Sequence, residues 1–312
     1  MTASSSVDRR FTLMFLVMLT IAAGNTALQS VLPALGRSLG VKDSAVAAAF
    51  SVSALLWVVA APFWADRSDR HGKRAMILLG VGGFSVSLTL CGLFLAAGIN
   101  HWIGGTLAFV LFIGGRLIYG TFGSAAPPAV QAIIAGETTR GLVMGHAQAM
   151  TSQAIGFLVI DRLHVAPDKA LEPTGIVLMM GAGAALLAQW GVIPRLNLAP
   201  RALVLVGLML AAAGTALTGL GTSLYTIATA YALASLGFGF TRPGFTAGAS
   251  LAVGAEAQGS VAGKVTSVNG ASFVLGPSIG VGLYELRHSL PYLAAGAACA
   301  VMIVYAWAAL RD

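Results

Sequence analysis

The chain alternates between long apolar runs and short polar segments. Each apolar run has roughly 20 residues, the length that crosses the ~30 Å hydrocarbon core of a bilayer as a helix. The pattern therefore predicts an all-α integral membrane protein with ten transmembrane spans. We expect these spans at residues 11–32, 44–65, 75–98, 104–134, 142–160, 174–194, 202–220, 224–248, 261–284 and 290–310.

The composition agrees with a membrane protein. Hydrophobic residues make up 57% of the chain and charged residues only 9%, whereas soluble domains contain about 25% charged residues. The 39 glycines suit a tight bundle, because small residues let helices approach closely in lipid. A basic leader precedes the first run, but that run is longer than a signal-peptide core and more spans follow. We expect it to be retained as the first helix.

Lysine and arginine in the short connections predict the orientation, because cytoplasmic connections carry more of them. With the N-terminus inside, the inner segments hold eleven basic residues: Arg9, Arg10, Arg67, Arg70, Lys73, Arg74, Arg140, Arg195, Arg201, Lys264 and Arg311. The outer segments hold five: Arg37, Lys42, Arg162, Lys169 and Arg287. We therefore expect both termini in the cytoplasm.

Several functional classes are disfavoured. The net charge of +7 follows from the basic inner segments and does not indicate nucleic acid binding. Cys91 and Cys299 lie inside apolar runs and are expected to be small core residues. The sequence contains no phosphate-binding Gly-x-x-x-x-Gly-Lys-Ser/Thr loop and no clustered His, Asp, Glu or Cys residues within a span. We therefore expect neither an enzyme, nor a cofactor, nor a metal site.

The segment at 62–74, between the second and third spans, carries the most specific motif. It resembles the signature loop of the major facilitator superfamily, although Ala65 stands where that family usually has glycine. The matching residues are Asp69, Arg70, Gly72, Lys73 and Arg74. The resemblance implies a conformational latch, in which ion pairs close the inner face and break as a transporter opens. The alternative is an ordinary basic connection.

The fourth span contains Arg116, followed by Gly120 and Gly123. This pattern is similar to the fourth helix of the same superfamily. An arginine within a span is energetically costly and is therefore a functional candidate. The alternative is a structural arginine that binds neighbouring carbonyl groups.

The ninth span contains the dipeptide Gly276-Pro277. Proline removes a backbone donor, so we expect a bend in this helix. The dipeptide resembles a Gly-Pro motif of drug-exporting members of the superfamily.

An internal repeat is offset by four helices. Three residues recur 118 positions later, as Gly136, Gly141 and Gly145 and then Gly254, Gly259 and Gly263. Three more recur 127 positions later, as Arg74, Ala75 and Gly80 and then Arg201, Ala202 and Gly207. The superfamily repeats after six helices, which implies an internal deletion of about two. We expect a four-span N-terminal bundle at 1–141, a fused fifth span at 142–160, and a five-span C-terminal bundle at 161–312.

Polar side chains on apolar helices are candidates for substrate binding or coupling. They are Asn25, Gln29, Arg116, Tyr119, Gln148, Gln153, Arg242 and Asn269. Each could instead form hydrogen bonds between helices. No Asp or Glu lies near the middle of a span, since Asp161 and Glu137 lie at span ends. Proton coupling is therefore implied by resemblance more than by residues, with His146 as one further titratable group.

The resemblance is closest to proton-linked drug exporters related to tetracycline efflux proteins. It implies a multi-pass protein of the plasma (inner) membrane, expected as a monomer, that transports a small molecule in exchange for protons by alternating access. The sequence leaves two alternatives open. The chain could carry another solute, such as a sugar or metabolite, or it could be an inactive, internally deleted relic.

Overall fold

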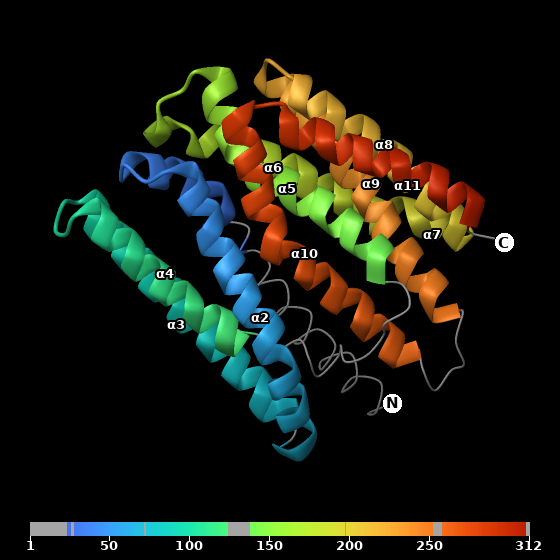
Figure 1. Ribbon diagram of the computed structural model, residues 1–312, viewed down its shortest axis with the longest axis horizontal. Coiled ribbons are helices and arrows are strands. Elements are labelled where there is room, and N and C mark those ends of the chain that lie inside the picture. The colour runs from blue at the N-terminus through green and yellow to red at the C-terminus, as the bar shows by residue number, and fades with distance from the viewer. Residues whose placement is uncertain are drawn as a thin grey trace, which may run out of the picture.

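The computed structural model describes residues 24–25, 28–71, 73–123, 138–196, 198–251 and 258–309, which form a bundle of long helices (Figure 1). The first described helix covers 28–38. The others are α2 (Asp43–His71), α3 (Lys73–Ile99), α4 (Gly105–Phe122), α5 (Thr138–Leu163), the short η2 (Pro167–Lys169), α6 (Leu171–Leu186), η3 (Leu187–Val192), α7 (Ile193–Leu196), α8 (Pro200–Leu220), α9 (Leu224–Leu251), α10 (Gln258–Leu286) and α11 (Leu290–Ala309). The described ranges contain no β-strand.

Seven of the described helices are long and apolar enough to cross a membrane. They are α2, α3, α4, α6 with its continuation through α7, α8, α9 and α11. The long helices α5 and α10 are less apolar and are not among the seven. Because α5 packs against α10 and α11, its neighbours cover much of its surface. A helix shielded from lipid can carry polar residues such as Thr151 and Gln153, which are both buried.

The segment at 62–74 was expected to be a loop, and that expectation is wrong for most of its length. Helix α2 continues to His71 and α3 begins at Lys73, so Asp69, Arg70, Lys73 and Arg74 are helical. Polar residues beyond the hydrocarbon core can extend a helix into water, because lysine and arginine are good helix formers. Gly72 lies outside the described residues, and the structure gives no side-chain positions for the other four motif residues.

The first helix also ends later than expected, at residue 38 instead of 32. Gly40 ends it in the left-handed backbone region, with φ of 73°, which glycine adopts without steric cost. The Val41 amide donates to the Gly36 carbonyl over 2.9 Å, and the Gly40 amide to the Arg37 carbonyl over 3.1 Å. These two bonds form a Schellman motif. The motif places Arg37 in the last turn of the helix, beside the start of α2.

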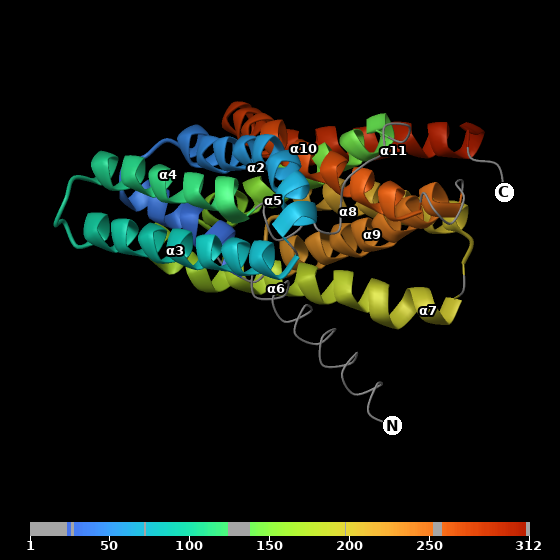
Figure 2. The same ribbon diagram turned by 90° about the horizontal axis from the view of Figure 1, so that it is seen from below.

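The contacts between helices repeat with the predicted offset of four. Helix α4 packs against α3 and α2, and α9 packs in the same way against α8 and α6. Helices α10 and α11 pack against α5, and α10 also packs against α2. Figures 1 and 2 show α2, α3 and α4 on one side of α5 and α10, with α8, α9 and α11 on the other. We call these the first and second helix groups. We assign the 28–38 helix, which Arg37 joins to Asp43 of α2, to the first group and α5, α6 and α10 to the second.

The connections after the first helix, α3, α5, α8 and α10 lie along one edge of the bundle (Figure 1). We call this edge the outer end, because the distribution of basic residues predicts that it faces away from the cytoplasm. Arg162 fastens this end of α5 by donating to the Gly219 carbonyl of α8 over 3.0 Å and to Ser289 Oγ over 2.9 Å. The end of α5 is therefore fixed to the second group.

Glycines let α5 and α10 pack closely. A Cβ atom on Gly276 would come within 2.6 Å of Ala149 Cβ, and one on Gly280 within 2.6 Å of Met150 Cα. Real Cβ contacts are longer, so the α5–α10 interface has no space for a side chain at either position. The predicted Gly276-Pro277 dipeptide therefore lies at a helix interface, and Pro277 stands within the continuous helix α10.

We expect Gly280→Ala to destabilise the protein by about 1–3 kcal/mol, because the added methyl group forces two backbones apart. The measurement is the thermal unfolding of detergent-purified protein. Gly282→Ala is the matched control, since no atom lies within 4 Å of a Cβ at that position of the same helix. Equal unfolding temperatures for the two variants would contradict the close α5–α10 interface.

Candidate functional site

Arg116 of α4 is buried, with 5% of its surface exposed. Its Nη1 donates to Asn25 Oδ1 over 3.2 Å. Its guanidinium carbon lies 4.9 Å from the centre of the Phe50 ring and 4.7 Å from that of Tyr119. These distances are typical of cation–π contacts. The positive charge is therefore held by two aromatic faces and one amide oxygen.

The sequence builds this pocket from three helices. Tyr119 follows Arg116 by three residues on α4, so both side chains lie on one helix face. The Tyr119 ring is packed by Trp57 of α2 at 5.3 Å and by Phe84 of α3 at 5.6 Å, measured between ring centres. The aromatic rings leave few polar partners for the arginine, and Arg116 Nε has none among the described residues. We call Asn25, Phe50, Arg116 and Tyr119 the arginine pocket.

Of the predicted candidates, the structure brings Asn25, Arg116 and Tyr119 together. Gln29 is partly buried in the first helix, and Gln148 is partly buried in α5. Arg242 lies on α9 in the second group and is exposed. The structure gives no side-chain position for Asn269 in α10. The predicted set is thus divided between the two helix groups, and only one part of it forms a described cluster.

Gln153 stands out among the remaining candidates. It is 2% exposed, and neither Nε2 nor Oε1 has a hydrogen-bond partner within the described residues. Burying an amide without partners costs about 1–3 kcal/mol for each unsatisfied group. Such a group commonly binds an ordered water or a ligand. Gln153 therefore remains a candidate ligand-binding residue on α5.

Four tryptophans of the bundle are of two kinds. Trp102 and Trp190 are 77% and 65% exposed, as an interfacial anchor requires. Trp64 is buried, and its Nε1 donates to the Thr121 carbonyl over 2.6 Å. Trp57 packs against Tyr119. Trp64 and Trp57 therefore help to hold α2 against α4.

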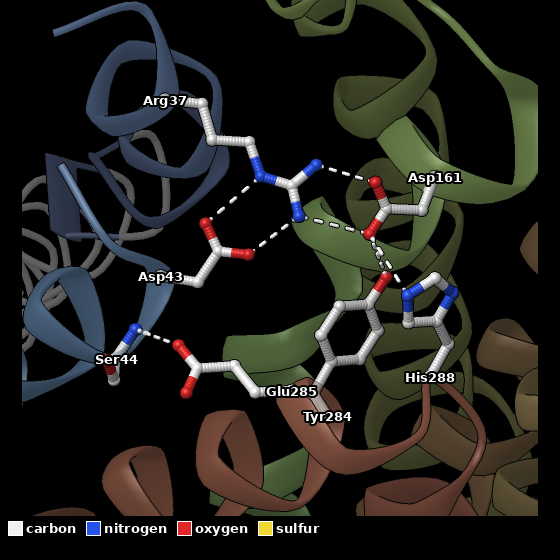
Figure 3. A network of polar contacts seen from close by, with 7 residues as sticks. All are labelled: Arg37, Asp43, Ser44, Asp161, Tyr284, Glu285 and His288. Carbon is white, nitrogen blue, oxygen red and sulfur yellow. Dashed lines mark hydrogen bonds and ion pairs between the residues drawn. The ribbon is translucent and has the colours of Figure 1, made fainter. Parts of the chain in front are cut away.

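A second polar cluster lies at the outer end of the bundle. Arg37 lies between two aspartates (Figure 3). Its Nε and Nη2 donate to Asp43 Oδ1 and Oδ2 over 3.0 and 2.6 Å. Its Nη1 and Nη2 donate to Asp161 Oδ1 and Oδ2 over 2.6 and 3.0 Å. One guanidinium therefore binds both carboxylates in a bidentate manner, the arrangement that arginine forms best.

Residues at the end of α10 complete this cluster. The Tyr284 hydroxyl donates to Asp161 Oδ2 over 2.6 Å. His288 Nε2 lies 3.7 Å from the same oxygen, and its ring stacks on that of Tyr284 at 4.8 Å. Glu285 Oε1 accepts from the Ser44 backbone amide over 2.9 Å, at the start of α2 (Figure 3). We call Arg37, Asp43, Ser44, Asp161, Tyr284, Glu285 and His288 the outer network.

In the central ion pair the pKa of Arg37 is raised and that of Asp161 is lowered, so both shifts favour the charged form of the side chain. The hydrogen bonds to Asp43 and then to Asp161 raise the pKa of Arg37, despite partial burial. Partial burial on its own raises the pKa of Asp161. The hydrogen bonds from Arg37 and Tyr284 together outweigh that effect and leave this pKa below its ordinary value. The two groups are therefore both charged at neutral pH.

This network was not predicted from the sequence. Arg37 was expected in an outer connection and Asp161 at a span end, and no contact between them was foreseen. One signal was present: opposite charges stand at the outer ends of two spans that run in the same direction through the membrane. The pairing itself could not be found, because Arg37 and Asp161 are 124 residues apart and only the packing of α5 brings them together.

Both the sequence and the fold of this protein are similar to those of known proteins. Residues 14–160 match the family model described as Major Facilitator Superfamily. The fold is similar to that of the human organic anion transporter MFSD10 (TETRAN), with a TM-score of 0.61, 16% identity, and coverage of 95% of this chain and 98% of that one. Over residues 14–160, a little under half of the chain, the protein is similar to the major facilitator superfamily, and its fold is that of a transporter of known structure. Both findings agree with the seven described helices that are long and apolar enough to cross a membrane.

Two other known proteins are similar to this one. The fold is also similar to that of the nucleoside transporter NupG (D323A mutant), with a TM-score of 0.61, 12% identity, and coverage of 96% of this chain and 100% of that one. The Multidrug resistance protein MdtG of Proteus mirabilis (strain HI4320) is 35% identical over 75 residues. That match covers 22% of this chain and 19% of MdtG, so it spans about a fifth of this relative.

Replacing the central cation of the outer network should destabilise the protein. We expect Arg37→Gln to cost about 1–3 kcal/mol, because it leaves two partly buried carboxylates without their shared partner. Thermal unfolding of purified protein measures the loss, and Lys42→Gln, a nearby exposed cation, is the control.

The loss of stability caused by Arg37→Gln should also depend on pH. The pKa of Asp161 is lowered in the folded protein, so its ion pair contributes stability above the ordinary pKa of 3.8. That contribution disappears as the pH falls through the lower, folded-state pKa. The difference in unfolding temperature between the two proteins should therefore narrow below about pH 4. A difference that widens in acid would contradict the assigned ion pair.

Proposed function

We propose that this transporter exports drug-like organic molecules in exchange for protons, by alternating access. The arginine pocket is the observation that carries this proposal. It combines a buried cation with unsatisfied hydrogen-bonding capacity and several aromatic faces, inside a helix group that crosses the membrane. A buried charge in such a position is expensive and is usually retained for function.

The chemistry of the pocket suits amphipathic aromatic molecules. The rings of Phe50 and Tyr119 surround the Arg116 guanidinium with apolar atoms, and Arg116 Nε is a donor without a partner among the described residues. Ligand pockets are typically apolar with a few well-placed polar groups. Gln153 on α5, in the other helix group, has amide atoms that also lack a partner within the described part of the chain. A substrate held between the groups would be able to contact both.

The similarity to a protein named for multidrug resistance supports drugs as the substrate class. It covers only 75 residues, so the choice of drugs over sugars or other metabolites belongs to this proposal. We further propose that the protein resides in the plasma (inner) membrane with both termini in the cytoplasm. This orientation follows from the distribution of basic residues.

Alternating access requires contacts that close each end of the bundle in turn. At the outer end, Arg37 joins the first helix to Asp161 of α5, and Glu285 of α10 joins the start of α2. We propose that these contacts close the outer end. We propose that Asp69, Arg70, Gly72, Lys73 and Arg74 form the corresponding latch at the inner end.

Whole-cell accumulation of a fluorescent drug tests the proposal. Cells that express the chain should accumulate less drug than empty-vector cells, and a protonophore should abolish the difference. Arg116→Ala should reduce export by about tenfold or more, the effect of losing roughly 1.4 kcal/mol or more of binding or coupling. Arg195→Ala is the matched control, since Arg195 is exposed on α7 and donates only to its own helix at Gly191.

A companion strain should express the chain with the deleted segment of about two helices restored within the fused fifth span at 142–160. Export by the restored chain alone would indicate that the shorter chain is an inactive relic. Export by neither chain, together with uptake of a sugar or nucleoside, would favour a facilitator of another solute and overturn drug efflux.

A further inference from the structure

The outer network joins the two helix groups through two carboxylates, Glu285 and Asp161, and Asp161 is the one that binds a cation of the first group. Asp161 ends α5, which Arg162 fixes to α8 and to the connection after α10. Arg37 ends the first helix and binds Asp43 at the start of α2. Separation of the two groups at the outer end must therefore remove Arg37 from Asp161, while Asp43 can move with Arg37.

Three side chains surround Asp161 Oδ2, and they lie at different distances from it. Arg37 Nη2 lies 3.0 Å away and the Tyr284 hydroxyl 2.6 Å away, so both form hydrogen bonds. His288 Nε2 lies 3.7 Å away, beyond the distance of a normal hydrogen bond. Its ring is nonetheless held in place by stacking on Tyr284. His288 is thus positioned as an additional partner of Asp161.

We propose that Arg37 and a protonated His288 compete for Asp161, so that protons from the outer side open the outer end. This inference rests on the alternating-access function proposed above. In the closed arrangement Arg37 neutralises Asp161 and repels an imidazolium. When Arg37 withdraws, Asp161 becomes an unpaired carboxylate beside His288. Asp161 then favours the charged imidazole.

Linkage gives the direction of the effect. A ligand that binds one of two conformations more tightly shifts the equilibrium toward that conformation. The proton binds His288 more tightly in the open arrangement, so external acid stabilises opening. An imidazole can take up this proton because histidine is the side chain that most readily exchanges a proton near neutral pH.

Outside protons can reach this histidine. The side chain of His288 is 51% exposed. It lines a recess of about 820 Å³ at the outer end, together with Asp161, Arg162, His164, Glu285 and Arg287. No movement of the helices is needed before protonation, because the imidazole already faces water.

The other charged or titratable groups near His288 have separate roles. Arg37 and Asp43 approach from the first helix and α2 and already bind each other. Arg162 is engaged with Gly219 and Ser289, and Glu285 accepts from the Ser44 amide. Tyr284 and Tyr292 approach from α10 and α11, Arg287 lies in the connection between them, and His164 follows α5. Since His164 is a histidine of the same recess but is not part of the outer network, it provides the matched control.

Accessibility of a single cysteine reports opening without any transport. Ser51 Oγ and Ser278 Oγ lie 2.8 Å apart, between α2 and α10 and deeper in the bundle than the network. We would introduce Ser51→Cys after replacing Cys91 and Cys299 by alanine; both native thiols are buried. The full-length protein in intact cells is then treated with a membrane-impermeant maleimide from outside.

In this background, labelling should rise at least about fivefold as the external pH falls from about 7.5 to 5.5, the lower end of typical coupling between two sites. His288→Gln should label slowly at both pH values, and His164→Gln should keep the full response. Arg37→Gln should label rapidly at both pH values, because it removes the competitor. Monodisperse elution in detergent confirms that each variant is folded.

Two results would overturn the inference. One is an acid response that survives in His288→Gln, and the other is slow, pH-independent labelling in Arg37→Gln. Loss of drug export together with an intact pH response would count against drug efflux, and the competition for Asp161 would stand. Drug export without a pH response in labelling would overturn the competition for Asp161, and drug efflux would stand.

Discussion

The high free-energy cost of a charge away from water organises this molecule. Charged side chains are rare in the apolar helices, and two arginines of the bundle, Arg37 and Arg116, are held by specific partners. Arg116 lies between aromatic rings and an amide, whereas Arg37 lies between two carboxylates. The first is embedded in one helix group, and the second joins the two groups. Each arginine therefore marks a place where the fold depends on one polar arrangement.

The sequence predicted most of the fold, because the requirement to cross a bilayer leaves a strong and simple pattern. Helices α8, α9 and α11 begin and end within a few residues of the expected spans. The segment at 62–74 was misjudged, since hydropathy shows where apolar residues stop but not where a helix stops. The end of the first helix was misplaced for the same reason. There, a mixed segment that ends with Arg37 and Ser38 continues the helix until Gly40 ends it.

The candidate site was less predictable. Asn25, Arg116 and Tyr119 were recognised because polar groups are conspicuous in apolar helices, and the structure brings them together. Arg37, Asp161 and His288 stand near helix ends, where charged residues are ordinary. Their connection depends on how α5 packs between the groups, and the packing depends on glycines at the α5–α10 interface. Tertiary contacts of this kind leave no local periodic signal.

The bond between Glu285 and the Ser44 amide has a consequence for the energetics of movement. The first amides of any helix lack partners within that helix, and here a side chain from another helix supplies one. Because this amide lies beside the aqueous boundary, a water molecule can take the place of Glu285 when the helices part. The exchange leaves no donor stranded in hydrocarbon. Separation at this point therefore replaces one hydrogen bond by another of similar strength, so that the helix end itself adds little to the activation barrier.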